Sequence, residues 1–242
     1  MVGLGPSRAF RDRVDAGQVL AQHLQTHAGR PDVVVVGLPR GGVPVAREVA
    51  AALGADLDVL VVRKLGVPGH GELAMGAIAP GGVRVLNPTV VSALDIPEEA
   101  IEHVAARETA ELQRRLELYR GDRPFPSLTE KVVIVVDDGL ATGATMRAAV
   151  AALRGDHPRR VVVAVPVGAR TTCEELARDA DEVVCARMPA LFEAVGQWYR
   201  DFSPTTDEEI RRLLHEWELG RPTASPPAGA ESAAPDEELD GR

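Results

Sequence analysis

The sequence predicts an α/β fold built on a doubly wound parallel sheet, and two observations carry this prediction. Four valine-rich runs are continuously hydrophobic rather than alternating, as expected for strands that are covered on both faces. Helical patterns separate these runs, and strands that alternate with helices favour right-handed crossovers between parallel strands. The 242 residues, of which 45% are hydrophobic, suit one such domain with a small appendage, or at most two small domains.

The predicted elements follow one another in a regular order. The strands are Val33–Gly37, Leu57–Val62, Val132–Asp137, Val161–Val165 and, more weakly, Glu182–Cys185. The helices beside them are Val14–His27, Val43–Leu53, Thr145–Leu153, Thr172–Asp179 and, after the last strand, Asp207–Glu218.

The alternation breaks between Arg63 and Pro126. Residues Arg63–Pro80 are rich in Gly and Pro, which predicts a mobile loop leading into a short hairpin near Ala77–Leu86. One long amphipathic helix, Pro97–Tyr119, follows, with an apolar face made of Ile101, Val104, Ala105, Leu112, Leu116 and Tyr119. This helix either stacks on a partner subunit or over the site, or is an ordinary surface helix.

The chain is predicted to form one domain over residues 8–220. Within it, residues 63–126 form an insertion of lid loop, hairpin and long helix, and residues 186–219 form a small hood with the C-terminal helix. Residues 221–242 are rich in Pro, Ala, Ser and Glu and carry −3 of the net charge of −9, which predicts a disordered acidic tail.

Composition excludes several classes of protein. No apolar run approaches the roughly 20 residues of a membrane span, and the N-terminus has no secretory signal pattern, so we expect a cytoplasmic protein. The spacing of Cys173 and Cys185 indicates neither a disulfide framework nor a zinc site. The acidic charge argues against nucleic acid as a partner, so any phosphate must be held locally.

The segment from Val132 to Thr145 carries the strongest functional signal. A buried strand delivers Asp137 and Asp138 to the carboxyl edge of the sheet, where ligands bind in open α/β folds. The following turn of Gly, Ala and Thr opens a helix, so its backbone N–H groups can close around a phosphate. The pair of carboxylates suits sugar hydroxyls or Mg²⁺. A merely tight strand–helix turn is the alternative.

Two further segments favour anion binding. The turn Gly37–Gly42 follows the first strand, and its glycines allow the backbone to approach an anion while Arg40 offers a fork of donors. Arg63 and Lys64 are expected to end the second strand at the same carboxyl edge. Adjacent cations there suggest an anionic ligand, although ordinary solvated surface is the alternative.

These residues resemble the type I phosphoribosyltransferase family over most of Phe10–Leu219. The match is carried by Asp137-Asp138-Gly139-Leu140-Ala141-Thr142-Gly143-Ala144-Thr145, which is similar to the family's motif for 5-phosphoribosyl-1-pyrophosphate (PRPP). A bacterial branch whose members mostly lack an assigned acceptor is similar in further segments: Phe10-Arg11-Asp12-Arg13, Leu38-Pro39-Arg40-Gly41-Gly42, Arg63-Lys64-Leu65-Gly66 and Val195-Gly196-Gln197-Trp198-Tyr199. Ala141 replaces the more common Thr, which removes one hydroxyl and keeps the backbone donors.

The resemblance implies a role for each segment. Asp137 and Asp138 would be the catalytic pair that holds the ribose hydroxyls and, through those hydroxyls or water, Mg²⁺. The 5′-phosphate would be bound by Ala141, Thr142, Gly143, Ala144 and Thr145, and pyrophosphate by Pro39, Arg40, Gly41, Lys64 and, second, Arg63. His70 and Glu72 fall where the family has its catalytic loop; His70 would be a proton donor or simply a solvated histidine.

Half of the eight aromatic residues fall within one stretch of eleven positions in the expected hood: Phe192, Trp198, Tyr199 and Phe202. By the same resemblance, Phe192 or Trp198 would stack on the acceptor, with Glu193 and Asp201 as weaker contacts. The alternative is that the rings pack the C-terminal helix onto the core.

The expected function is transfer of the phosphoribosyl group from PRPP to a nitrogen acceptor of nucleobase type, with release of pyrophosphate. The alternatives are a sensor of PRPP or a nucleotide that regulates a partner without catalysis and, more weakly, a hydrolase. The family and the long helix suggest a homodimer, and the sequence does not identify the acceptor.

Overall fold

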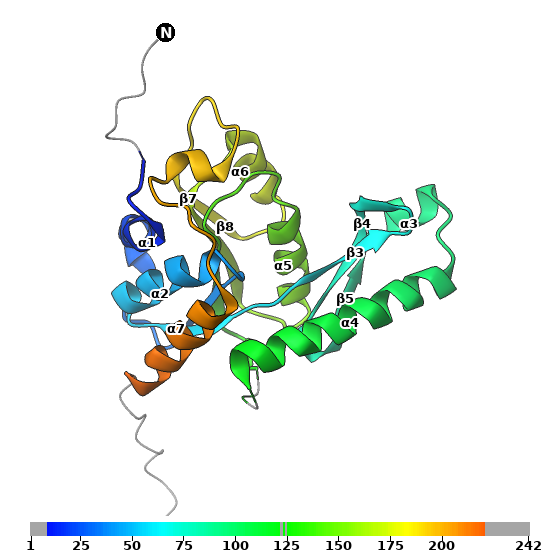
Figure 1. Cartoon of the computed structure of the whole chain (residues 1–242), viewed down its shortest axis with the longest axis horizontal. Helices are drawn as coiled ribbons and strands as arrows, with labels where there is room; N and C mark the ends of the chain where they lie inside the picture. The colour runs from blue at the N-terminus through cyan, green and yellow to red at the C-terminus, as the bar shows by residue number, and fades with distance from the viewer. Residues whose placement is uncertain (1–8, 122, 124, 221–242) are drawn as a thin grey trace, which may run out of the picture.

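The centre of the molecule is a five-stranded parallel sheet (Figure 1). The computed structural model describes residues 9–121, 123 and 125–220, so the predicted acidic tail at 221–242 lies outside it. In spatial order the strands are β2 (Asp56–Val59), β1 (Val33–Gly37), β6 (Val132–Val136), β7 (Arg160–Val167) and β8 (Glu182–Arg187). The parallel sheet predicted from the sequence is confirmed.

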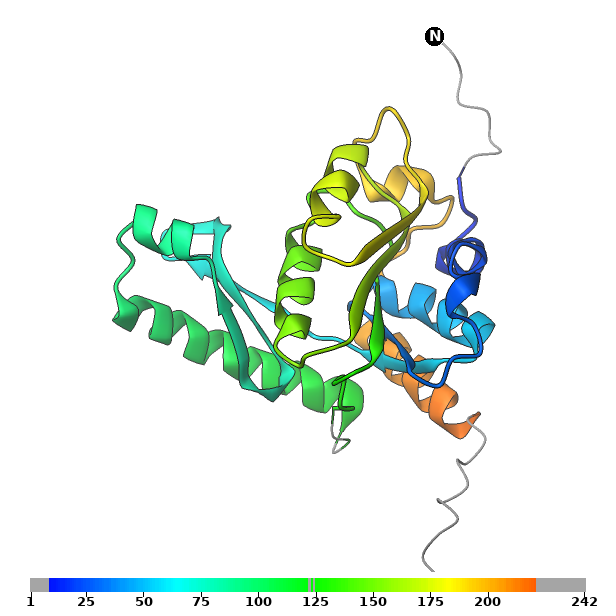
Figure 2. The same ribbon diagram turned by 180° about the vertical axis from the view of Figure 1, so that it is seen from behind.

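Helices cover both faces of this sheet, as the unbroken valine runs require (Figure 2). Val33 and Val35 of β1 face the cluster that includes α1 and α2, whereas Val34 and Val36 face the cluster built with α5 and α6. These helices are α1 (Arg13–Gln22), α2 (Gly42–Leu53), α5 (Ala144–Arg154) and α6 (Arg170–Leu176). Short 3₁₀ turns lie at Gln25–His27, Pro80–Gly82 and Val195–Trp198.

Residues 63–120 form an arm that projects from the side of the core (Figures 1 and 2). Its second sheet is antiparallel, in the order β3 (Arg63–Val67), β4 (His70–Ala79) and β5 (Val83–Leu86). Two helices complete it, α3 (Pro88–Ala93) and α4 (Glu98–Arg120). The hairpin and the long helix are confirmed.

The mobile loop predicted over Arg63–Pro80 is wrong, because most of this segment forms β3 and β4. Gly69, in the turn between β3 and β4, has a φ of +76°, a conformation that favours glycine and is typical of a turn. Gly76 has a different cause: a Cβ at this position would lie 2.4 Å from the carbonyl oxygen of Val85 on β5. Glycine here permits close strand pairing rather than motion.

The last helix, α7 (Asp207–Leu219), packs against α4, α2 and β2. Its start is held by Tyr119 of α4, whose hydroxyl donates to Asp207 Oδ1 at 2.6 Å. Among the described helices, none is both long and apolar enough to cross a membrane.

Candidate active site

The turn after β1 and the loop after β6 lie side by side because these two strands are neighbours in the sheet. Gly37 pairs with Val136, and the N–H of Leu38 donates to the carbonyl of Val136 at 2.8 Å. The turn after β1 therefore meets the two acids after β6 at the carboxyl edge of the sheet, as the sequence predicts.

Glycine is required where these loops touch. A Cβ on Gly41 would lie 1.9 Å from Asp138 Oδ2, and one on Gly42 would lie 2.5 Å from the carbonyl oxygen of Val136. Gly41 also precedes α2, whose first turn has no side-chain cap. Arg40 is exposed beside it, and the peptide bond between Pro39 and Arg40 is cis.

The two acids are fixed by contacts from both ends of the chain. Asp137 Oδ1 accepts from the backbone N–H of Asp138 at 2.8 Å. Asp138 Oδ2 is paired with Arg13, from Nε at 2.9 Å and from Nη2 at 2.8 Å. The Tyr199 hydroxyl donates to the carbonyl of Asp138 at 2.5 Å.

The folded protein disfavours the charged form of both carboxyl groups and so raises their pKa values. Burial, followed by the neighbouring charge of Asp138, raises the pKa of Asp137 to about 8. Burial also raises the pKa of Asp138, against the opposing effect of Arg13. A ligand that donates hydroxyl protons, or a cation, would offset this cost.

The loop after the acids opens directly onto the N-terminus of α5. Gly143 precedes this helix with a φ of +72°, and no side chain caps its first turn. Thr142, Ala144 and Thr145 are exposed, as is Ala141. Free amide groups at a helix N-terminus form a natural site for an anion.

Residues behind this loop brace it. Thr172 Oγ1 donates to the carbonyl of Ala141 at 2.7 Å, and Arg147 Nη2 donates to the carbonyl of Thr142 at 2.9 Å. A Cβ on Gly143 would lie 2.6 Å from Thr172 Cγ2. The protein's own contacts therefore preorganise the loop.

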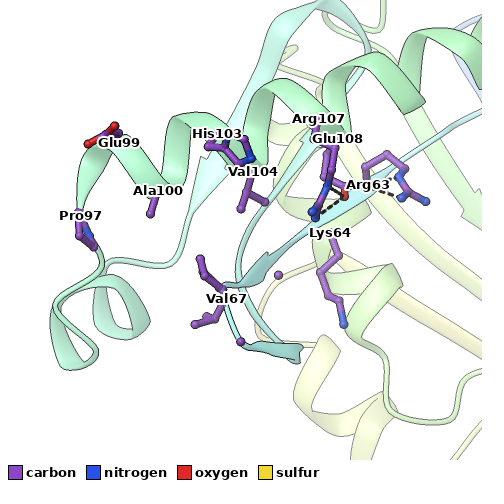
Figure 3. A pocket seen from close by; sticks show the side chains of 13 residues that line it. Arg63, Lys64, Val67, Pro97, Glu99, Ala100, His103, Val104, Arg107 and Glu108 are labelled. Carbon is purple, nitrogen blue, oxygen red and sulfur yellow. Dashed lines mark hydrogen bonds and ion pairs between the residues drawn. The ribbon is translucent and has the colours of Figure 1, made fainter.

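Arg63 and Lys64 do not end the second parallel strand, as the sequence analysis expected. That strand ends at Val59, and both cations belong to β3 of the arm. Arg63 pairs with Glu108 of α4 at 2.6 Å, while Lys64 extends from β3 away from Glu108 (Figure 3).

A cavity of about 860 Å³ lies between β3 and α4 and includes Arg63 and Lys64 in its lining (Figure 3). Its other polar lining side chains are Glu99, His103, Arg107 and Glu108. The two acids and the loop after them are not part of this lining. His70 is exposed at the nearby hairpin turn, and the side chain of Glu72 lies outside the described part of the chain.

The hood aromatics serve mainly as packing. Trp198 and Tyr199 are buried in a cluster with Phe10, Ala16 and Val167, and Phe192 packs against this cluster. No member belongs to α7, so the rings fasten the N-terminal segment to the sheet rather than the C-terminal helix. Phe202 is 36% exposed, and its ring centroid lies 4.2 Å from the guanidinium carbon of Arg13.

Sequence reasoning missed Arg13 and Phe202. Arg13 stands in a segment quoted for the family resemblance, but nothing in its spacing links it to Asp138. No cluster of three or more His, Cys, Asp or Glu suited to a metal occurs among the described residues. Two adjacent carboxylates nevertheless fit Mg²⁺ that arrives with a phosphate ligand, since Mg²⁺ commonly takes one or two carboxylates plus substrate oxygens.

Comparison with known proteins agrees with this geometry. A family model described as a phosphoribosyl transferase domain matches residues 12–197. Proteins of two Mycobacterium tuberculosis strains, each named "Putative phosphoribosyl transferase", are 52% identical over 207 residues, covering 86% of this chain. The crystal structure of TT1426 from Thermus thermophilus is 46% identical with a TM-score of 0.79, covering 86% of this chain and 99% of that one.

The chain spans 46% of the length of the M. tuberculosis relatives, so less than half of those proteins is represented here. The family model, in contrast, covers most of this chain, including both ligand loops and the two acids. The chain belongs to the phosphoribosyl transferase family.

Proposed function

We propose that this protein transfers the 5-phosphoribosyl group of PRPP to a nitrogen acceptor and releases pyrophosphate. The observation that carries the proposal is the juxtaposition of two uncapped helix N-termini, α2 and α5, on either side of Asp137 and Asp138. PRPP carries phosphate groups at both ends of a ribose ring. The two helix N-termini would bind these phosphate groups, and the two acids between them would bind the ribose hydroxyls.

Each part of the site has a role in this reaction. The amides of Ala141–Thr145, with the Thr142 and Thr145 hydroxyls, hold the 5′-phosphate. Asp137 and Asp138 accept hydrogen bonds from the ribose hydroxyls, and Pro39, Arg40 and Gly41 hold pyrophosphate with Lys64. Arg63 has the weaker claim, since Glu108 already occupies its guanidinium.

The chemistry requires positioning more than covalent participation. The bond between C1 of the ribose and the pyrophosphate oxygen breaks with its electrons on oxygen, and the acceptor nitrogen forms the new bond to C1 and loses its proton. The ring gains oxocarbenium character, so the protein must fix the ribose and stabilise the leaving group. When bound with PRPP, Mg²⁺ would neutralise phosphate charge beside the two acids.

The acceptor would lie beside the hood. Phe202 offers an exposed ring next to Arg13, and it is a better stacking candidate than Trp198, which is 8% exposed. A nitrogen heterocycle of nucleobase type fits such a surface.

The proposal is tested by calorimetric titration with PRPP and Mg²⁺. The wild type should bind, and the double variant Asp137→Asn with Asp138→Asn should lose most of the affinity because ribose loses its charged acceptors. The matched control is Asp95→Asn, which changes an exposed carboxylate between α3 and α4. Absence of binding by the wild type, or full binding by the double variant, would reject the site.

A second measurement separates a transferase from a sensor. Pyrophosphate release is followed with PRPP and a panel of purines, pyrimidines and other nitrogen heterocycles. Release that depends on one heterocycle supports transfer. PRPP binding with no release across the panel favours the regulatory alternative.

A further inference from the structure

Arg13 connects three parts of the molecule that are far apart in sequence. It is the first residue of α1, and its Nε and Nη2 groups contact Oδ2 of Asp138 at 2.9 and 2.8 Å. Its remaining Nη1 group donates to the carbonyl of Ser203 at 2.7 Å. Side-chain exposure is 12% for Arg13 and 15% for Asp138, so solvent screens the pair weakly.

Apart from Asp138, the partners of Arg13 belong to one unit that the N-terminal segment forms with residues 195–203. The backbone of Phe10 pairs with Tyr199: its N–H donates to the carbonyl of Trp198, and its own carbonyl accepts from Arg200, both at 2.8 Å. Phe202 stacks against the Arg13 guanidinium. The hood therefore consists of the N-terminal segment and residues 195–203 together.

The turn after β1 approaches the same oxygen of Asp138. A Cβ on Gly41 would lie 1.9 Å from Oδ2 and 3.1 Å from Arg13 Nε, so a side chain there would overlap the oxygen. Arg13 contacts Oδ2 alone. Arg13 and the turn thus both engage Oδ2, and in the proposal a ligand hydroxyl would donate to Oδ1.

We propose that Arg13 is a positioning residue, which orients the Asp138 carboxylate toward the ribose of the substrate and ties this orientation to the hood. The inference rests on the proposed function, because it assumes that Asp138 binds ribose. Arg13 lies beside Gly41, but its polar contacts go to Asp138 and Ser203, so in this proposal it acts through Asp138.

The test measures two ligands separately. Ribose 5-phosphate and pyrophosphate, each with Mg²⁺, are titrated into the wild type and into Arg13→Met. The ribose ligand should bind about tenfold more weakly to the variant, and pyrophosphate, which the proposed function assigns to the turn after β1, should bind within about twofold of the wild type. Arg13→Lys keeps the charge and should recover part of the affinity.

Arg11→Met is the matched control. Arg11 lies two residues away in the same segment, is 67% exposed at its side chain and pairs with Asp15 rather than with an active-site acid. Its replacement should leave both affinities unchanged.

A double-mutant cycle distinguishes positioning from general damage to the hood. If Arg13 acts through Asp138, Arg13→Met should weaken ribose 5-phosphate binding little further in an Asp138→Asn background. Equal losses in both backgrounds, or parallel losses of ribose and pyrophosphate affinity, would overturn the inference. So would wild-type affinity of Arg13→Met for ribose 5-phosphate. Failure of the wild type to bind ribose 5-phosphate would instead reject the proposed function, and the inference with it.

Discussion

Gly41 is the residue through which the turn after β1 contacts Asp138. A methyl group at this position would overlap the Asp138 carboxylate, which is itself held by Arg13. We expect Gly41→Ala to push the turn away from the acids and to weaken PRPP binding by at least about tenfold, measured by calorimetry.

Gly220→Ala is the control for Gly41→Ala. Gly220 follows α7 with a φ of −84°, and the nearest atom to an added Cβ would be an ordinary 3.4 Å away. The control should bind PRPP as the wild type does. Equal affinity of the Gly41→Ala protein would show that the two loops need not touch for the ligand to bind.

Among single residues, the sequence predicts which candidate site residues lie together when they follow neighbouring parallel strands. Asp137, Asp138 and the glycines of the first turn could be placed together because parallel strands end at one edge of a sheet. Arg13 could not, since 125 positions separate it from Asp138 and the contact depends on how the N-terminal segment pairs with the hood.

The two adjacent cations of the arm, Arg63 and Lys64, are expected to have different roles. Because Arg63 is tied to the buried Glu108, Arg63→Met should lower the free energy of unfolding by about 2 kcal/mol. Lys64→Met should instead weaken pyrophosphate binding, because it removes a cation from the proposed pyrophosphate site. Chemical denaturation and calorimetric titration of both variants measure these effects, with each variant the control for the other. Weaker pyrophosphate binding only in Arg63→Met would reverse the assignment.

The arm also shows why one element was mispredicted. Glycine and proline at Arg63–Pro80 are compatible with a loop or with tightly paired strands, and local composition does not separate these cases. The deciding feature is the approach of β5 to Gly76, which depends on residues beyond the segment. The long helix α4 was predictable because its apolar face repeats at helical spacing over many residues.

Across the whole molecule, the net charge of −9 conceals how the charges are arranged. Two of the acids lie half-buried together at the site, beside Arg13 from the N-terminal segment. The layered fold was predictable because the central strands β1 and β6 are uniformly apolar and buried on both faces. The composite hood was not, because it joins segments whose pairing has no periodic signal.

The acid pair makes the stability of the ligand-free protein depend on pH. The pKa of Asp137 is about 8 in the folded protein and near 3.8 when unfolded, so between these values the folded state binds more protons. Its contribution to stability is therefore complete below about pH 4 and is lost as the pH rises through about 8. We expect the midpoint temperature of thermal unfolding to decrease as the pH is raised from 5 to 8.5. The decrease should be smaller in Asp137→Asn, which keeps the acceptor for the Asp138 N–H. Scanning calorimetry in both proteins measures the effect of the acid pair, because Asp137→Asn removes this carboxyl group together with its repulsion of Asp138; parallel curves would show that Asp137 ionises normally in the fold.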